Sequence, residues 1–314
     1  MNKTTIMSRL FILINFVFSL VVLHAQPLPI VENGTIERIE KLSSKYVDAR
    51  NVDVWLPESY SPKKKYAVLY MHDGQMLYDS TTTWNKKSWD VDKIITRLIR
   101  EGKLQDLIVV GVWNGDKSRH ADYFPQKPFE SLDANKRELV LNAARNNGVS
   151  VFGNYQIQSD GYLKFLVEEL KPLIDKKYST RKDAAHTFIA GSSMGGLISM
   201  YAICEYPNVF GGAACLSTHW PGIFVTKDNP IPDAFVDYLK NNLPNPKHHK
   251  FYFDYGDKTL DAMYPPLQKK VDEVMKEKGY TEKKWLTKYF PGQDHSEGSW
   301  RSRFEIPLEF LLGK

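Results

Sequence analysis

The stretch "HTFIAGSSMGGLISMYAICEYP", residues 186–207, decides the predicted fold of this chain. It opens with a short apolar run that ends at Gly191, which is typical of a buried strand. Residues 195–206 then follow a helical pattern, so the strand turns into a helix with almost no linker. The turn, Gly-Ser-Ser-Met-Gly-Gly, places small residues around Ser193. A plain turn would need only one glycine and a polar residue, so this pattern indicates a special role for the serine.

The rest of the chain repeats this alternation of buried strands and amphipathic helices. A half-exposed strand is predicted at 51–57, and residues 114–155 are expected to form a long irregular loop region over one end of a sheet. Strands alternating with helices of this length predict a mostly parallel sheet covered on both faces, in one domain over 26–314. The other predicted strands are 66–74, 107–112, 186–191, 211–217, 250–256 and 284–290, and the helices are 89–100, 161–178, 195–206, 232–242, 262–278 and 299–312.

The first 25 residues are predicted to be a secretory signal peptide. Lys3 and Arg9 precede the apolar run 10–23, and Ala25 offers a small residue for cleavage before Gln26. The run is shorter than the roughly 18–20 residues that a membrane-spanning helix needs, although an uncleaved anchor remains the alternative. We therefore expect a secreted or periplasmic protein whose mature part is not stably inserted in a membrane.

Charge and cysteine content exclude several classes of protein. The formal charge of +5 falls to +3 without Lys3 and Arg9, too little to predict binding to nucleic acid. Cys204 and Cys215 are the only cysteines, and their apolar surroundings favour two buried thiols over a disulfide. Around His120 the acidic residues are only loosely clustered, so neither a metal site nor any other cofactor is predicted.

Ser193 has the sequence context of a nucleophile. The pattern Gly-x-Ser-x-Gly between a strand and a helix is a nucleophile elbow, which lifts the hydroxyl clear of the sheet at a helix N-terminus. A side chain at either flanking glycine is expected to collide with the strand or the helix. The positive end of the helix dipole would favour an oxyanion formed at this point.

A serine hydroxyl needs a base to remove its proton, and His295 is the predicted one. It follows the last predicted strand and precedes the last helix, within "FPGQDHSEGSW" (290–300). His72 and His219 also follow strands, but they occur too early in the chain for the order Ser, Asp, His that α/β-hydrolases show. An acid should orient the imidazole. Both Asp257, close to a strand end, and Asp261, at the start of a helix, are candidates for that acid.

Two backbone N–H groups are expected to stabilise the oxyanion. One belongs to Met194, the residue after the nucleophile, and the other to the loop after an early strand. "HDGQML" (72–77) supplies that loop, with Gln75 as the donor and Gly74 allowing the chain to bend.

Taken together, the residues His72–Gln75, Gly191–Gly196, Gly256–Asp261 and Asp294–Glu297 resemble the putative-esterase family of α/β-hydrolases. That family includes feruloyl, acetyl-xylan and enterochelin esterases. The resemblance implies an α/β-hydrolase fold, ester hydrolysis without a metal, and the acid role for Asp261. Relatives commonly have Thr where this chain has Asp257, which puts a second carboxylate nearby.

The resemblance implies a small-molecule or oligosaccharide ester as substrate but not which ester. Export favours an acylated carbohydrate with feruloyl or acetyl groups, and aromatic residues such as Trp84, Trp113 and Phe224 lie in loops near strand ends, where they are available to stack on it. The alternatives are a siderophore ester, acyl transfer to a sugar, or a carbohydrate-binding protein without catalytic activity.

Overall fold

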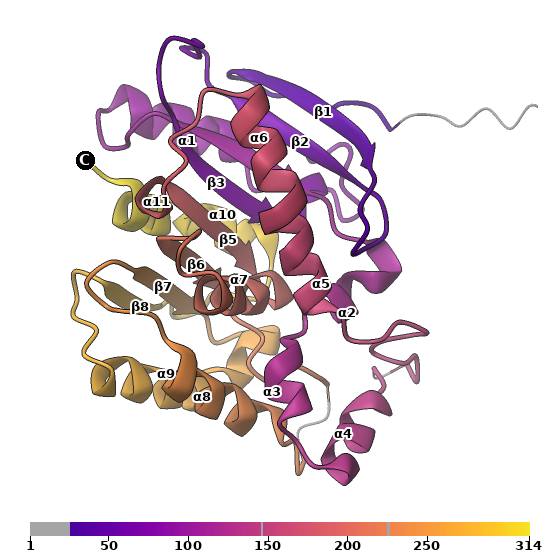
Figure 1. Ribbon diagram of the computed structural model, residues 1–314. Coiled ribbons are helices and arrows are strands. Elements are labelled where there is room, and N and C mark those ends of the chain that lie inside the picture. Colours follow the sequence, from indigo (N-terminus) through magenta and orange to yellow (C-terminus); the bar gives the residue numbers. More distant parts are fainter. Residues whose placement is uncertain (1–25, 146, 225–226) are drawn as a thin grey trace, which may run out of the picture.

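One eight-stranded sheet runs through the computed structural model, which describes residues 26–145, 147–224 and 227–314 (Figure 1). The strand order is β1-β2-β4-β3-β5-β6-β7-β8; β2 is antiparallel to both of its neighbours, and all other pairs are parallel. This confirms the predicted mostly parallel sheet. The strands are β1 (Thr35–Leu42), β2 (Arg50–Leu56), β3 (Ala67–His72), β4 (Leu107–Val112), β5 (Thr187–Ser192), β6 (Gly212–Leu216), β7 (Lys250–Tyr255) and β8 (Trp285–Tyr289). The signal peptide predicted for 1–25 lies outside the described residues.

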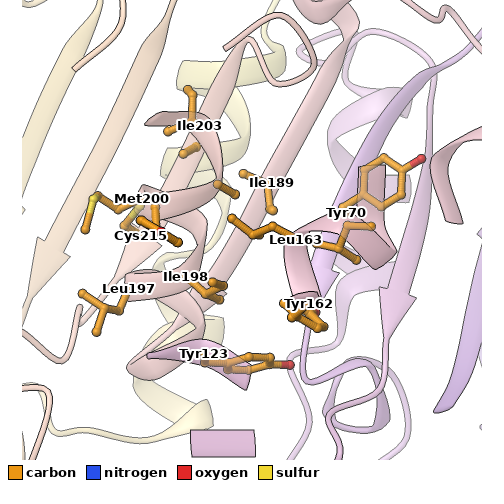
Figure 2. Packing of buried hydrophobic residues seen from close by; sticks show 14 of the residues in the cluster. Tyr70, Tyr123, Tyr162, Leu163, Ile189, Leu197, Ile198, Met200, Ile203 and Cys215 are labelled. Carbon is orange, nitrogen blue, oxygen red and sulfur yellow. The ribbon is translucent and has the colours of Figure 1, made fainter. Parts of the chain in front are cut away.

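Helices cover both faces of the sheet (Figure 1). On one face pack α5 (Ser159–Lys164), α6 (Lys171–Lys177), α7 (Met194–Glu205), α8 (Ile231–Asn242) and α9 (Pro265–Glu277), and on the other α1 (Val91–Arg100), α10 (Glu297–Arg303) and α11 (Glu305–Leu312). Each face has its own apolar core because successive strand residues point to opposite sides. In β3, Val68 and Tyr70 join the first core, while Leu69 and Met71 join the second. Figure 2 shows part of the first core, where α7 packs on the sheet.

The structure corrects three of the predicted segments and adds the strand β1, which was not predicted. The region 114–155 is not wholly irregular, since it contains the short helices α2 (Arg119–Tyr123), α3 (Gln126–Glu130) and α4 (Ala134–Leu141). The helix predicted at 161–178 is divided by a π-helical turn over Phe165–Leu170. Pro172 lacks an N–H and crowds the preceding turn, and the wider π-turn accommodates it. Pro307 similarly lies just after Phe304, where the last predicted helix divides into α10 and α11.

Both cysteines are free and buried, as predicted. Within the described ranges no helix has the length and apolar character needed to cross a membrane.

Candidate active site

The turn between β5 and α7 places Ser193 at the start of the helix. Its backbone has φ 58° and ψ −122°, a strained region for a residue with a side chain. The end of β6 holds this conformation, because the Ser193 N–H donates to the Leu216 carbonyl at 2.9 Å. The Ser193 carbonyl in turn accepts a hydrogen bond from the His219 N–H at 3.2 Å. The strained turn is therefore supported from a neighbouring strand.

The two glycines that flank the turn differ in how much space a side chain would have. A Cβ on Gly191 would lie 2.7 Å from the carbonyl carbon of Gly195, so a side chain cannot fit there. At Gly195 a Cβ would come no closer than 3.4 Å to Asp73 and His72, a tolerable contact. The expected collision therefore occurs at Gly191, and for Gly195 the prediction was wrong.

The structure brings His295 and Asp261 together. The imidazole Nδ1 of His295 lies 2.6 Å from Oδ1 of Asp261, whose side chain is fully buried. Thr259 fixes the loop after β8, since its hydroxyl accepts a hydrogen bond from the His295 N–H at 2.9 Å. Asp257 is not part of this contact. It accepts hydrogen bonds from the Tyr289 hydroxyl at 2.7 Å and the Gly292 N–H at 3.0 Å.

A hydrogen-bond network holds the other oxygen of Asp261. Its Oδ2 accepts from the Ser217 hydroxyl at 2.6 Å and from the Gly256 N–H at 2.7 Å. The Ser217 oxygen itself accepts from Trp300 Nε1 and Arg303 Nη2, both at 2.9 Å. Because two donors already point at this oxygen, the hydroxyl proton of Ser217 is directed to Asp261. The carboxylate is thus held in one orientation with Oδ1 free for His295.

Behind Ser217 lies a buried ion pair between Arg303 and Asp254. Arg303 donates from Nε to Oδ2 at 3.1 Å and from Nη2 to Oδ1 at 2.9 Å, and both side chains are almost completely inaccessible. Burial raises the pKa of Asp254, against the opposing effect of the Arg303 guanidinium. Sequence reasoning did not find Ser217, Asp254 or Arg303 as supporting residues.

The loop after β3 packs closely against β4. The residue with the left-handed backbone is Asp73, at φ 57°, rather than Gly74. Gly74 is needed for close approach, because a Cβ there would lie 2.5 Å from the carbonyl carbon of Gly111 in β4. Asn114 Nδ2 and the Arg119 guanidinium fix the Asp73 carboxylate by hydrogen bonds of 2.6–2.7 Å. Burial opposes ionisation of Asp73, but Arg119 outweighs it and lowers the pKa of the carboxyl.

These loops enclose a cavity of about 800 Å³ at the carboxyl ends of the parallel strands. Ser193, His295, Met194 and Gln75 all line it, although they come from three separate parts of the chain. Its aromatic and charged walls include Trp84, Trp89, Phe224, Trp300, Lys87, Asp116, Arg119, Arg145 and Glu297. Ligands of open α/β sheets bind at this edge, so the cavity is the candidate active site. In the described part of the chain, no group of His, Cys, Asp or Glu residues is arranged to hold a metal ion.

Three histidines near this edge are buried. Burial lowers the pKa of His72 to about 3 and that of His120 to about 3, and it lowers the pKa of His219 as well. His72 Nδ1 pairs with the Tyr162 hydroxyl at 2.8 Å, and His120 Nε2 donates to the Gly222 carbonyl at 2.8 Å. All three therefore remain neutral at the pH where an unfolded histidine would begin to gain a proton.

The buried histidines predict a loss of stability in acid. Below pH ~6.5 the unfolded chain binds protons that the folded chain does not, so the free energy of unfolding falls, by up to about 1.4 kcal/mol per pH unit for each histidine. We expect His72→Asn to lower stability at pH 8 but to reduce the further loss between pH 7 and pH 5. Urea unfolding at pH 8, pH 7 and pH 5 measures both effects. An identical loss in the variant and the wild type would contradict the neutral, buried state of His72.

Comparison with known proteins shows the family to which the chain belongs. The family described as "Putative esterase" matches residues 43–306. Among curated relatives, Uncharacterized protein YbbA of Bacillus subtilis is 22% identical over 281 residues, which is 87% of this chain and 96% of the relative. An Endo-1,4-beta-xylanase/feruloyl esterase of Xylanibacter ruminicola is 26% identical over 223 residues, covering 67% of this chain and 24% of the relative.

Solved structures show the same fold. A ferulic acid esterase superposes with a TM-score of 0.61 at 19% identity, covering 89% of this chain and 98% of the other. The enterochelin esterase of Shigella flexneri superposes with a TM-score of 0.62 at 16% identity, covering 90% and 59% of the two chains. The sheet and its covering helices form an α/β-hydrolase fold. The chain belongs to the "Putative esterase" family and is a carboxylic ester hydrolase.

Proposed function

We propose that this protein is a serine esterase that works through an acyl-enzyme. The observation that carries the proposal is the pairing of His295 with Asp261 in the same cavity that Ser193 lines at the β5–α7 turn. Only Asp261, of the two acids considered, contacts the imidazole. The buried network of Ser217 and Arg303 supports its orienting role, because it leaves Asp261 a single orientation.

Each residue has a defined part in the reaction. His295 takes the proton of the Ser193 hydroxyl as the serine oxygen bonds to the ester carbonyl carbon. The N–H groups of Met194 and Gln75 donate to the oxyanion of the tetrahedral intermediate. As the intermediate collapses, the bond to the alcohol oxygen breaks and His295 returns the proton to that alcohol. Water, activated by the same imidazole, then releases the acid and regenerates the serine.

The preferred substrate in this proposal is an acylated carbohydrate with feruloyl or acetyl groups. The cavity combines aromatic walls with polar groups, and the Trp84 side chain at its edge is 82% exposed. Such a surface suits a phenolic acyl group or a sugar face. The relative that is a xylanase and feruloyl esterase, and the similar ferulic acid esterase fold, are consistent with this class. The predicted signal peptide would place the protein outside the cytoplasm, where such polymers are found.

A siderophore ester is the second candidate. Arg145 and Lys87 line the cavity, and within the described ranges neither forms an ion pair with a carboxylate. The Arg145 guanidinium lies 4.9 Å from the centre of the Phe224 ring, so a cation and an aromatic ring stand side by side, available to an anionic aromatic group. The fold similarity to an enterochelin esterase points in the same direction.

Fluorophosphonate labelling tests the shared mechanism, and a substrate panel separates the two candidates. We expect one label per chain, mapped by mass spectrometry to Ser193, and no label after acid unfolding. Feruloylated and acetylated xylo-oligosaccharides should be cleaved with a kcat/KM well above that for a tris-catecholate ester. A label on another serine would contradict the mechanism, and the reverse order of substrates would favour the siderophore ester.

A further inference from the structure

A second cavity, of about 540 Å³, lies beside the candidate active site. The two cavities share four lining residues, namely Gln75, Trp84, Asn114 and Asp116. Among these is Gln75, whose N–H is the proposed oxyanion donor, so the second cavity begins next to the place where an ester carbonyl would lie. A substrate in the first cavity can therefore extend into the second without crossing the protein core.

Hydrogen bonds within the chain hold the walls of the second cavity in place. One wall is the segment from Gln26 to Pro29, which Arg38 fixes by donating to the carbonyls of Gln26 at 2.7 Å and Pro27 at 3.1 Å. Another part of the wall comes from the loop after β3, where Asp79 accepts a hydrogen bond from the Ile30 N–H at 3.0 Å. These bonds tie two segments that are distant in sequence, so a ligand need not order them on binding.

The charges in this cavity are mostly neutralised. Arg38 pairs with Asp53 through two hydrogen bonds of 2.6 and 2.8 Å, and both side chains are nearly inaccessible. Trp113 completes the cluster, because its Nε1 donates to Asp53 at 2.8 Å and the Arg38 guanidinium lies 4.6 Å from the centre of its ring. Of the three charged residues in this lining, Arg38 and Asp53 pair with each other and Asp116 keeps its negative charge. That charge would repel an anionic ligand.

The remaining lining suits a neutral ligand with many hydroxyl groups. The exposed Thr81 and Thr82 donate their hydroxyl protons to Asp79 and so present their oxygens as acceptors, and Asp116 adds a carboxylate. Trp84 stands at the boundary between the cavities with 82% of its surface exposed. Exposed indole rings stack on the apolar C–H face of a sugar, while polar neighbours bind its hydroxyls. A volume of a few hundred Å³ is in the usual range for small-ligand sites.

We propose that the second cavity binds the sugar units of the alcohol part of the ester, next to the unit that carries the acyl group. This inference rests on the proposed function, because it assumes that the first cavity cleaves an acylated carbohydrate. The protein would then recognise an esterified oligosaccharide by its chain as well as by its acyl group.

The test compares pairs of esters that differ only in the alcohol. The probes are methyl ferulate with a feruloylated arabinoxylo-trisaccharide, and methyl acetate with acetylated xylotriose. We expect a kcat/KM at least about ten-fold higher for the saccharide ester of the preferred acyl group. Thr82→Trp, which places a ring in the second cavity, should remove most of that advantage. Lys278→Trp adds the same ring at an exposed position far from the cavity in sequence and serves as the matched control.

A direct binding measurement accompanies the kinetics. Calorimetry on Ser193→Ala should show weaker binding of the feruloylated trisaccharide when Thr82→Trp is added. Equal kcat/KM for the methyl and saccharide esters, or an equal effect of Thr82→Trp on both, would overturn the sugar site while leaving the esterase mechanism intact. Failure to hydrolyse any ester, together with no fluorophosphonate labelling, would instead reject the proposed function.

Discussion

Replacing Ser193 with Ala is expected to lower kcat for ester hydrolysis by about 10⁴-fold or more. The substitution removes the only atom that can form the acyl-enzyme in the proposed mechanism, while the backbone turn and the oxyanion donors remain. Initial rates with methyl ferulate and with p-nitrophenyl acetate measure the effect. Thermal unfolding of the variant verifies that the loss is not caused by unfolding.

Ser192→Ala is the matched control for this substitution. Ser192 is the adjacent serine, is 6% exposed and lines the same cavity, but it ends β5 instead of occupying the strained turn. We expect it to retain kcat within about ten-fold of the wild type, because it has no proposed covalent role. Full activity in Ser193→Ala, or an equal loss in both variants, would contradict the assignment of the nucleophile.

Asp261→Asn is expected to lower kcat by about 10³- to 10⁴-fold. An asparagine of the same size keeps the packing, but it no longer provides a charge for the imidazolium and favours the wrong tautomer of His295. The 2.6 Å contact between the two side chains makes this loss specific to position 261. Initial rates with p-nitrophenyl acetate, compared with those of the wild type, measure this loss.

Asp257→Asn tests the competing acid directly. Its carboxylate contacts Tyr289 and Gly292 and not the imidazole, so the variant should retain most of the wild-type kcat. A large loss in Asp257→Asn with a small one in Asp261→Asn would reverse the assignment. The two substitutions make the same chemical change four residues apart, so they separate the orienting role from a general effect of lost negative charge.

The buried strands were predictable from sequence because continuous apolar runs leave few alternatives. β3, β4 and β5 are buried at every position, and each was found at nearly its observed bounds. β1 was missed, because Thr35–Leu42 is an edge strand with partly exposed residues on both faces and charged residues along its length. The short helices in 114–155 were missed for a different reason. Tyr123 and Phe124 are fully buried there, so tertiary packing rather than local helical pattern stabilises that region.

In the candidate site, too, some residues were predictable from the sequence and others were not. Ser193, His295 and the two possible acids follow strand ends and carry a recognisable pattern, so sequence reasoning could name them. Whether Asp257 or Asp261 meets the imidazole depends on how the loop after β7 folds against the loop after β8, which a local pattern does not contain. The network of Ser217 and Arg303 depends on the order of β6 and β7 and on the position of α10. No spacing in the chain indicates that contact.

The position of His295 after the last strand has a consequence for how activity develops during synthesis. A chain that stops before β8 contains the serine, its turn and the acid, but it has no base for the proposed reaction. Hydrolytic capacity would then arise only when the final strand joins the sheet edge. Release of p-nitrophenol from a refolding sample would report completion of the whole architecture, in contrast to circular dichroism, which registers helices wherever they form in the chain.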